Sequence, residues 1–404
     1  MSKLLEQINK ESRIGSIKDL VFPVSSTYDF SNIGKVVFIN TGDVYEGKFL
    51  HKNYSNTEKL PGQAKKIIEH GDIVFSEIRP KNRHYALVDF DSKDYVVSTK
   101  LIVLKVKENI DPRFAYIVLT ADQNLREFQN IAESRSGTFP QITFEAIADY
   151  EVNIPDLPTQ KKIEEILSAY DSKIENNNKI IKNLELTAQT IFDEWFINFR
   201  FPEYEKAKMV ESEMGKVPEG WEVKKVSELF NVTLGGTPLR DKSEYWSGEI
   251  PWINSGEVNK LRIVEATEHI TDEGLRKSNA RLMNVGTTVL AITGATLGQV
   301  SRLEIESSAN QSVVGIYDEE NKLNEYMFLY IKSNIMDLIL GASGGAQQHI
   351  NKQMVENYKI LSPNSDTISN FTKNVLPMFK LIRGALFENL NLKQSRDQLL
   401  AKLI

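Results

Sequence analysis

The sequence predicts a mixed α/β (α+β) fold, in which two globular α/β domains alternate with two long helices that form an antiparallel coiled coil. Two heptad patterns of apolar residues each run for more than four repeats. Each position of the second pattern lies 208 residues beyond one of the first, as Ile163 and Phe371 show. Short β-branched runs punctuated by glycine fill the rest of the chain, which is typical of strands and turns.

The two heptad patterns define the predicted helices. Their apolar seam positions are Ile163, Leu167, Tyr170, Ile174, Ile181, Leu184 and Ile191 in the first, and Phe371, Val375, Met378, Ile382, Leu392 and Leu399 in the second. Asn177 and Asn389 each occupy one seam position, where a polar residue fixes the register. A helix of about 40 residues is roughly 60 Å long and needs a partner along its length. The alternative is that each helix packs only on its neighbouring domain. Pro377 predicts a kink or a late start of the second helix.

The duplicated pattern extends to the whole chain. The predicted segments are a first domain (1–157), a central helix (158–202), a charged linker (203–216), a second domain (217–363) and a terminal helix (364–404). In the first domain we expect strands at 36–39, 73–75 and 95–106, a helix from 113 to about 130, and a strand at 150–155. Asn40-Thr41-Gly42-Asp43 aligns with Asn254-Ser255-Gly256-Glu257, and Gly71 aligns with Gly286. This indicates a tandem duplication with approximate two-fold symmetry.

The composition is that of a soluble globular chain of two or three domains. Of 404 residues, 41% are hydrophobic and 26% are charged. The sequence contains no run of 18 apolar residues, so no membrane-spanning helix is predicted. The absence of cysteine excludes disulfides and thiolate chemistry and fits a cytoplasmic location. A net charge of −6 argues against an overall basic surface but allows a local basic face.

Several motifs, taken in order, resemble the specificity subunits of type I restriction-modification enzymes. They are Leu157-Pro158-Thr159-Gln160-Lys161-Lys162-Ile163, Val217-Pro218-Glu219-Gly220-Trp221-Glu222, Gly235-Gly236-Thr237-Pro238, Ile250-Pro251-Trp252-Ile253 and Asn310-Gln311-Ser312. The resemblance covers essentially the whole chain and implies two target recognition domains separated by an antiparallel coiled coil. It also implies a non-catalytic subunit whose partners are double-stranded DNA, methyltransferase subunits and restriction subunits. S-adenosylmethionine, ATP and magnesium are then expected on those partner subunits.

The sequence lacks the motifs of the chemistry that such a complex performs. There is no Asn-Pro-Pro-aromatic motif, no Gly-x-Gly and no Gly-Lys-Ser/Thr, so neither a base-gripping loop nor a phosphate-cradling loop is predicted. The histidines are scattered without the spacing of metal ligands: His51, His70, His84, His269 and His349. We therefore predict no catalytic and no metal-binding residue in this chain.

Four groups of residues, from five segments of the chain, are candidates for DNA contact. Their residues are Arg79, Lys81, Asn82, Arg83 and Tyr85; Arg135, Ser136, Thr138 and Gln141; Thr237, Arg240, Thr293 and Thr296; and Gln347, Gln348 and His349. Arginine and lysine hold phosphates, and arginine and asparagine also read base edges. The alternative is that these segments are solvated turns. Trp246 and Trp252 are expected to pack rather than to stack on bases.

Three functions compete. The first is a DNA reader that binds two unlike half-sites, because dimeric DNA-binding proteins place their half-sites about one helical turn, roughly 34 Å, apart. The second is a protein-interaction scaffold without a DNA-reading role, and the third is a self-sufficient methyltransferase. For docking of a methyltransferase subunit we expect part of an aromatic cluster at the end of the central helix: Phe192, Trp195, Phe196, Phe199 and Phe201.

Overall fold

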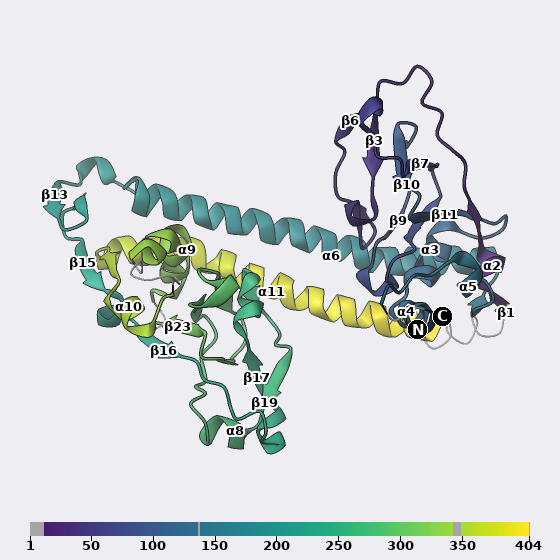
Figure 1. Cartoon of the computed structure of the whole chain (residues 1–404). Helices are drawn as coiled ribbons and strands as arrows, with labels where there is room; N and C mark the ends of the chain where they lie inside the picture. The colour runs from purple at the N-terminus through teal and green to yellow at the C-terminus, as the bar shows by residue number, and fades with distance from the viewer. Residues whose placement is uncertain (1–11, 136–137, 321, 342–348, 404) are drawn as a thin grey trace. The chain divides into compact units, whose positions relative to one another are not determined.

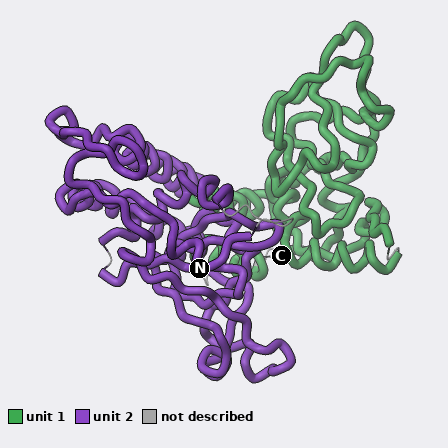
Figure 2. Tube along the Cα trace, turned by 60° about the vertical axis from the view of Figure 1, so that its left-hand side comes forward, with its two compact units in different colours: residues 1–174, 391–404 green, residues 175–390 purple. Residues whose placement is uncertain are grey.

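The computed structural model describes residues 12–135, 138–320, 322–341 and 349–403 (Figure 1). The chain divides into two compact units, coloured separately in Figure 2. Unit 1 comprises Met1–Ile174 and Asn391–Ile404, and unit 2 comprises Glu175–Leu390. Each unit contains one α/β domain and a part of both long helices. The boundary between the two units therefore falls within both long helices, so the units do not correspond to the five predicted segments.

Unit 1 is built on a four-stranded main sheet in the order β2-β11-β8-β9, and a second sheet in the order β6-β3-β10-β7 packs on it. The strands of unit 1 are β1 (Arg13–Ser16), β2 (Val21–Val24), β3 (Lys35–Ile39), β4 (Val44–Tyr45), β5 (Lys48–Phe49), β6 (Tyr54–Asn56), β7 (Ala64–Ile67), β8 (Ile73–Ser76), β9 (Tyr85–Leu87), β10 (Tyr95–Ser98), β11 (Leu101–Val106) and β12 (Glu151–Ile154). Its helices are α2 (Ile17–Leu20), α3 (Pro112–Thr120), α4 (Asp122–Arg135) and α5 (Phe144–Ile147).

Strand alternation places the core of unit 1 on both faces of the main sheet. Ile73 and Phe75 of β8 pack with helices α3 and α4, whereas Val74 faces the second sheet. Two predictions are corrected here. The expected single helix is broken at Ala121, whose backbone is extended (ψ 135°). The expected strand at 95–106 is two strands, β10 and β11, which belong to different sheets.

Unit 2 repeats this topology. Its main sheet has the order β16-β23-β20-β21-β18, which matches β2-β11-β8-β9 strand for strand and adds β18 at one edge. Its strands are β13 (Met209–Ser212), β14 (Gly215–Pro218), β15 (Glu222–Lys225), β16 (Asn231–Leu234), β17 (Trp246–Ile253), β18 (Arg262–Ile263), β19 (Glu268–Ile270), β20 (Thr288–Ala291), β21 (Val300–Leu303), β22 (Ser308–Ala309), β23 (Val313–Tyr317) and β24 (Lys359–Ser362). Its helices are α7 (Val226–Leu229), α8 (Asp272–Arg276), α9 (Asn324–Gly341) and α10 (Lys352–Asn357).

Matching local details confirm that the two units are copies. The turn after β3 and the turn after β17 begin at Asn40 and Asn254, as the sequence alignment predicts. In both turns the carboxylate three residues later, Asp43 or Glu257, accepts the backbone N–H of that asparagine, at 2.9 and 3.1 Å. The hairpin β13–β14 begins in the predicted linker and extends two residues beyond it, to Pro218.

The two long helices are α6 (Leu157–Phe192), which continues as a π-helical turn over Asp193–Ile197, and α11 (Ser365–Leu403). Side chains 208 residues apart cap their first turns, because Asp156 accepts the N–H of Thr159 and Asn364 accepts that of Thr367. The prediction of a late start at Pro377 is wrong, since α11 begins at Ser365 and runs through this proline.

The helices pair in an antiparallel direction within each unit (Figure 1). In unit 1, Leu167 and Leu399 share one core, and Arg396 Nη1 lies 2.6 Å from Asp171 Oδ1. In unit 2, the buried Asn177 donates from Nδ2 to Asn389 Oδ1 at 2.9 Å. The coiled coil and its two polar seam positions are thus confirmed, and all thirteen predicted apolar seam residues are buried or half-buried.

The aromatic cluster at the end of α6 belongs to the core of unit 2. Phe192 and Phe196 are buried against Phe371 of α11 and Tyr326 of α9. Neither side chain is therefore available to a methyltransferase subunit, and that expectation is left to Trp195, Phe199 and Phe201, which are only partly buried. None of the helices in the described part of the chain is long and apolar enough to cross a membrane.

Candidate nucleic-acid interface

Most of the predicted contact residues gather at one end of the main sheet in each unit. In unit 2, Val314 at the start of β23 pairs with Leu234 at the end of β16, and Val313 pairs with Ala291 at the end of β20. The loops that follow β16 and β20 and the loop that precedes β23 therefore meet. These loops contain the predicted residues Thr237, Arg240, Thr293 and Thr296.

Unit 1 has the same arrangement. Leu101 and Val103 of β11 pair with Ser76 at the end of β8 and Val24 at the end of β2. The basic turn after β8, residues 79–83, therefore lies at the equivalent end of the main sheet.

Hydrogen bonds join this basic turn to the loop after α4, although the sequence treats the two as separate patches. The backbone N–H of Arg79 donates to Pro140 O at 3.1 Å, and its Nη2 donates to Thr138 O at 3.4 Å. Ile142 N–H donates to Glu77 O at 2.8 Å. Unit 2 repeats the last bond, since Ile350 N–H donates to Ile292 O at 3.0 Å. Unit 1 thus presents one composite surface made of two loops.

The composite surface of unit 1 is polar and cationic. Arg79, Lys81, Asn82, Thr138 and Gln141 are exposed. Arg79 and Arg83 hold left-handed backbone conformations, with φ of 45° and 58°, which are uncommon for non-glycine residues and mark a constrained turn. Such a turn presents its side chains in a fixed direction.

Acidic neighbours lower the charge that two of these cations offer. Lys81 Nζ lies 3.6 Å from a Glu133 oxygen, and Arg83 Nη2 donates to Asp122 Oδ1 at 2.8 Å. Arg135, at the end of α4, is exposed and lies within 3.5 Å of Thr143 Oγ1.

Tyr85 is not part of this surface. It is 5% exposed and packs against Phe75 and Tyr116, so the prediction that it contacts DNA is wrong. Its place in β9 turns its ring into the core, and this burial raises the pKa of the phenol.

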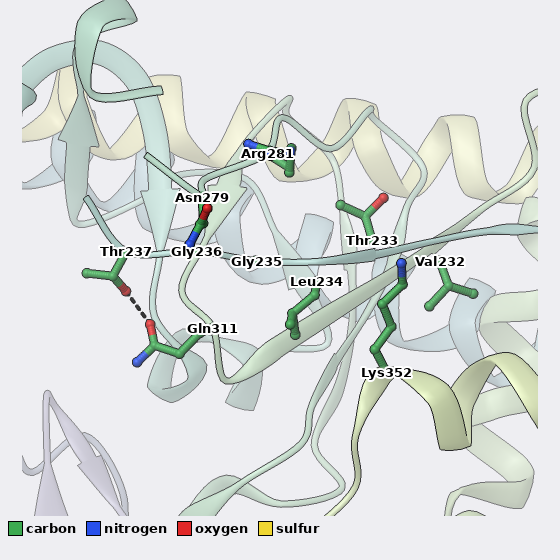
Figure 3. Close-up of a pocket in the computed structure, with 10 residues that line it drawn as sticks. All are labelled: Val232, Thr233, Leu234, Gly235, Gly236, Thr237, Asn279, Arg281, Gln311 and Lys352. Carbon is green, nitrogen blue, oxygen red and sulfur yellow. Dashed lines mark hydrogen bonds between the residues drawn. The ribbon is translucent and has the colours of Figure 1, made fainter. Parts of the chain in front are cut away.

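In unit 2 the loops enclose a pocket of about 620 Å³, drawn in Figure 3. We call it the Gly235–Gly236 pocket. Ten residues line it: Val232, Thr233, Leu234, Gly235, Gly236, Thr237, Asn279, Arg281, Gln311 and Lys352. The Thr237 hydroxyl donates to Gln311 Oε1, which fixes the amide beside the pocket (Figure 3). Of the predicted contacts in unit 2 that the structure describes, only Thr237 lines this pocket.

The remaining predictions have mixed outcomes. Thr293 and Thr296 are half-buried in the turn that corresponds to the basic turn of unit 1, and His349 is exposed beside Ile350. Ser136, Gln347 and Gln348 lie outside the described residues. No group of three or more histidine, aspartate or glutamate side chains within the described ranges is arranged to hold a metal ion.

Comparison with known proteins identifies the family. The family model of the type I restriction modification DNA specificity domain matches this chain twice, at residues 9–186 and 218–374. The chain belongs to this specificity-subunit family. A type I restriction enzyme HindI specificity subunit from Haemophilus influenzae is 34% identical over 96% of this chain and 98% of its own length. A MjaIX specificity subunit from Methanocaldococcus jannaschii is 26% identical over 67% of this chain and 63% of its own length.

A solved structure supports the fold. The crystal structure of a type I restriction-modification system S subunit from M. genitalium matches with a TM-score of 0.58 at 15% identity, over 97% of this chain and 96% of that chain. The chain is thus a specificity subunit by family, with two tandem recognition domains and two long helices.

In this specificity subunit, Arg240 is held by two neighbours. Its Nη2 lies 3.0 Å from Glu268 Oε2, and its guanidinium lies 3.7 Å above the ring of Trp246. The hydrogen bonds from Arg240 lower the pKa of the Glu268 carboxyl. A DNA phosphate would have to compete with this carboxylate for Arg240. Trp252 is buried, so its predicted packing role is confirmed.

Sequence reasoning missed three side chains at these surfaces. Gln311 lies in a motif that carries the family resemblance, and that motif could have indicated it. Phe139 is 71% exposed between two residues that are hydrogen-bonded to Arg79, and an apolar residue in a polar loop was a usable signal. Lys352 gave no local signal, because only the fold brings α10 next to the end of β16.

Proposed function

We propose that this chain is the DNA sequence-specificity subunit of a type I restriction-modification complex. Its two recognition domains bind a bipartite, asymmetric DNA target, and the chain scaffolds methyltransferase and restriction subunits. It makes no covalent change itself. S-adenosylmethionine, ATP and magnesium act on the partner subunits, and the complex works in the cytoplasm.

One observation supports this proposal above the others. Homologous sheets present their candidate loops at the same end, but the loops carry different side chains. The turn in unit 1 contains Arg79, Lys81 and Arg83, whereas the corresponding turn in unit 2 reads Gly294-Ala295-Thr296. DNA sequence is recognised by side chains that contact the base edges. Two copies of one recognition domain that carry different loops are therefore suited to two different half-sites.

Methylation-sensitive sequencing of the host genome tests the function directly. We expect an adenine-methylated motif of two short tracts separated by an unread spacer, and we expect it to vanish when the gene for this chain is deleted. Persistence of the motif would contradict the proposal. Footprinting of the chain with its modification partner tests the alternative of an interaction scaffold without a DNA-reading role. A complex that assembles but protects no DNA tract would support that alternative.

The basic turn of unit 1 gives a specific prediction. Replacing Arg79 and Lys81 together by glutamine should reduce the slope of log affinity against log salt concentration by about two, because each phosphate contact contributes about one. Lys59 and Lys93, both exposed in the same unit, provide the matched control when they are replaced together by glutamine. Titration of the assembled complex with target duplex measures the slope. An equal effect in both double variants would contradict a role of this turn in DNA binding.

The paired helices give a second prediction. Deleting residues 172–178 and 388–394 together removes one heptad from facing positions and preserves the pair between Asp171 and Arg396. Seven residues span about 10 Å, so the spacer of the methylated motif should shorten by about three base pairs if the helices set it. Sequencing of the methylated motif measures the spacer. Deleting one heptad alone should disrupt folding, and an unchanged spacer in the folded double deletion would contradict this role.

A further inference from the structure

We propose that the Gly235–Gly236 pocket of unit 2 binds one sugar-phosphate unit of the DNA backbone beside the half-site that this unit reads. The inference rests on the proposed function and adds a site to it. The pocket volume of about 620 Å³ lies in the range of small-molecule sites and accommodates a nucleotide.

The lining of the pocket matches a phosphate in charge. The described residues that line the pocket include two cations, Lys352 and Arg281, and no acidic side chain. Arg281 uses Nη1 to donate to Ala280 O at 2.7 Å, which anchors the guanidinium, and a guanidinium carries five N–H donors. Lys352 Nζ lies 3.3 Å from Glu356 Oε1, an exposed contact one helical turn away with which an incoming phosphate would compete. Charge-assisted bonds from these cations suit an anionic oxygen.

The floor of the pocket is backbone, because two glycines form it. A Cβ on Gly235 would lie 2.2 Å from Asn310 O, and a Cβ on Gly236 would lie 2.3 Å from the carbonyl carbon of Asn279. Both residues must therefore be glycine for the loops to pack this closely.

The other walls suit a sugar and its neighbouring oxygens. Val232 and Leu234 provide apolar surface for deoxyribose, and Leu234 is 38% exposed. Gln311 accepts from Thr237, so Figure 3 shows its amide nitrogen on the side away from that hydroxyl. Contacts with sugar and phosphate fix the register of a protein on a duplex and carry no sequence information.

Two matched variants test the site in the complex of this chain with its methyltransferase partner. Lys352→Gln and Arg281→Gln each remove one charge from the pocket. Lys277→Gln removes one from α8 in the same unit, where Lys277 pairs with Glu273 outside the pocket. Each pocket variant should weaken binding of target duplex about three- to tenfold at moderate salt and reduce the salt slope by about one. The preference for target over scrambled duplex should stay unchanged, and Lys277→Gln should match the wild type.

Neutral methylphosphonate linkages, placed one at a time along the target, locate the contact. We expect one linkage next to the second tract at which a methylphosphonate weakens DNA binding by the wild-type complex. At the same linkage, the methylphosphonate should not change DNA binding by the Lys352→Gln complex. If no position loses its effect in that variant, the inference is overturned. If inorganic phosphate or a free nucleotide binds at the pocket while duplex binding is the same in all three variants, the pocket takes small anions and the DNA assignment fails. Failure of the wild-type complex to bind the duplex would instead contradict the proposed function.

Discussion

Replacing Arg262 by methionine should destabilise unit 2 by about 3–5 kcal/mol, because it leaves the buried Glu185 carboxylate without its partner and weakens the cation cluster around Glu304. Arg262 Nε donates to Glu185 Oε1 of α6, and its Nη1 donates to Glu304 Oε1, both at 2.7 Å. The Arg262 side chain is 3% exposed, and those of Glu185 and Glu304 are 8% and 0% exposed. The pair thus ties the central helix to β18 at the edge of the recognition sheet.

A second arginine extends this network to the terminal helix, since Arg383 of α11 donates from Nε to Glu304 O at 3.2 Å. Urea unfolding, followed by hydrogen exchange of β18 and β21, measures the loss of stability. Lys277→Met removes an exposed ion pair at the end of α8 and should leave the free energy of unfolding nearly unchanged. Because a charged pair is more costly to break than to replace, Glu185→Leu combined with Arg262→Met should recover part of the loss, and Glu304 keeps its bond from Arg302 Nη1 at 2.9 Å. Equal stability of Arg262→Met and Lys277→Met would contradict a structural role of the network.

Phe371→Ala should also cost about 3–5 kcal/mol, because it opens a cavity where both long helices meet the domain of unit 2. Phe371 is fully buried, and its ring centroid lies 4.8 Å from that of Phe196 and 5.9 Å from that of Trp195. Loss of the ring removes the aromatic contact between α6 and α11 at this end. Phe371→Leu keeps most of the apolar volume and should cost less.

Leu381→Ala, on the same helix, is the matched control. Leu381 is 61% exposed, so its truncation should change the free energy of unfolding by about 0.5 kcal/mol or less. Chemical denaturation with tryptophan fluorescence, to which Trp195 contributes, measures both variants. A Phe371→Ala protein as stable as Leu381→Ala would show that the helix pairing in unit 2 does not depend on this cluster.

The architecture was predictable because it depends on the spacing of apolar residues along the chain. The heptad spacing and its 208-residue repeat need only the positions of apolar residues, and the turns at Asn40 and Asn254 form from bonds between near neighbours. Where the local pattern was ambiguous, prediction failed. The run from 95 to 106 looks like one strand, but its two halves pair with partners in different sheets.

The candidate surfaces were predictable only in part. Arg79 and Lys81 belong to a charged turn that the sequence shows, yet Tyr85, a few residues later, points into the core because it lies in a strand. Arg240 looks like a free cation in the sequence, and only the fold brings Glu268 and Trp246 to it.

The sequence by itself determined the duplication, the two paired helices and the absence of the usual catalytic motifs, since these depend on residue type and spacing along the chain. The tertiary structure decided which loops share a surface and which charges are buried. Arg262 meets Glu185 across 77 positions of the chain, and Lys352 reaches the end of β16 from more than a hundred positions away. Contacts over such separations arise when strands and helices pack, and no local pattern encodes them.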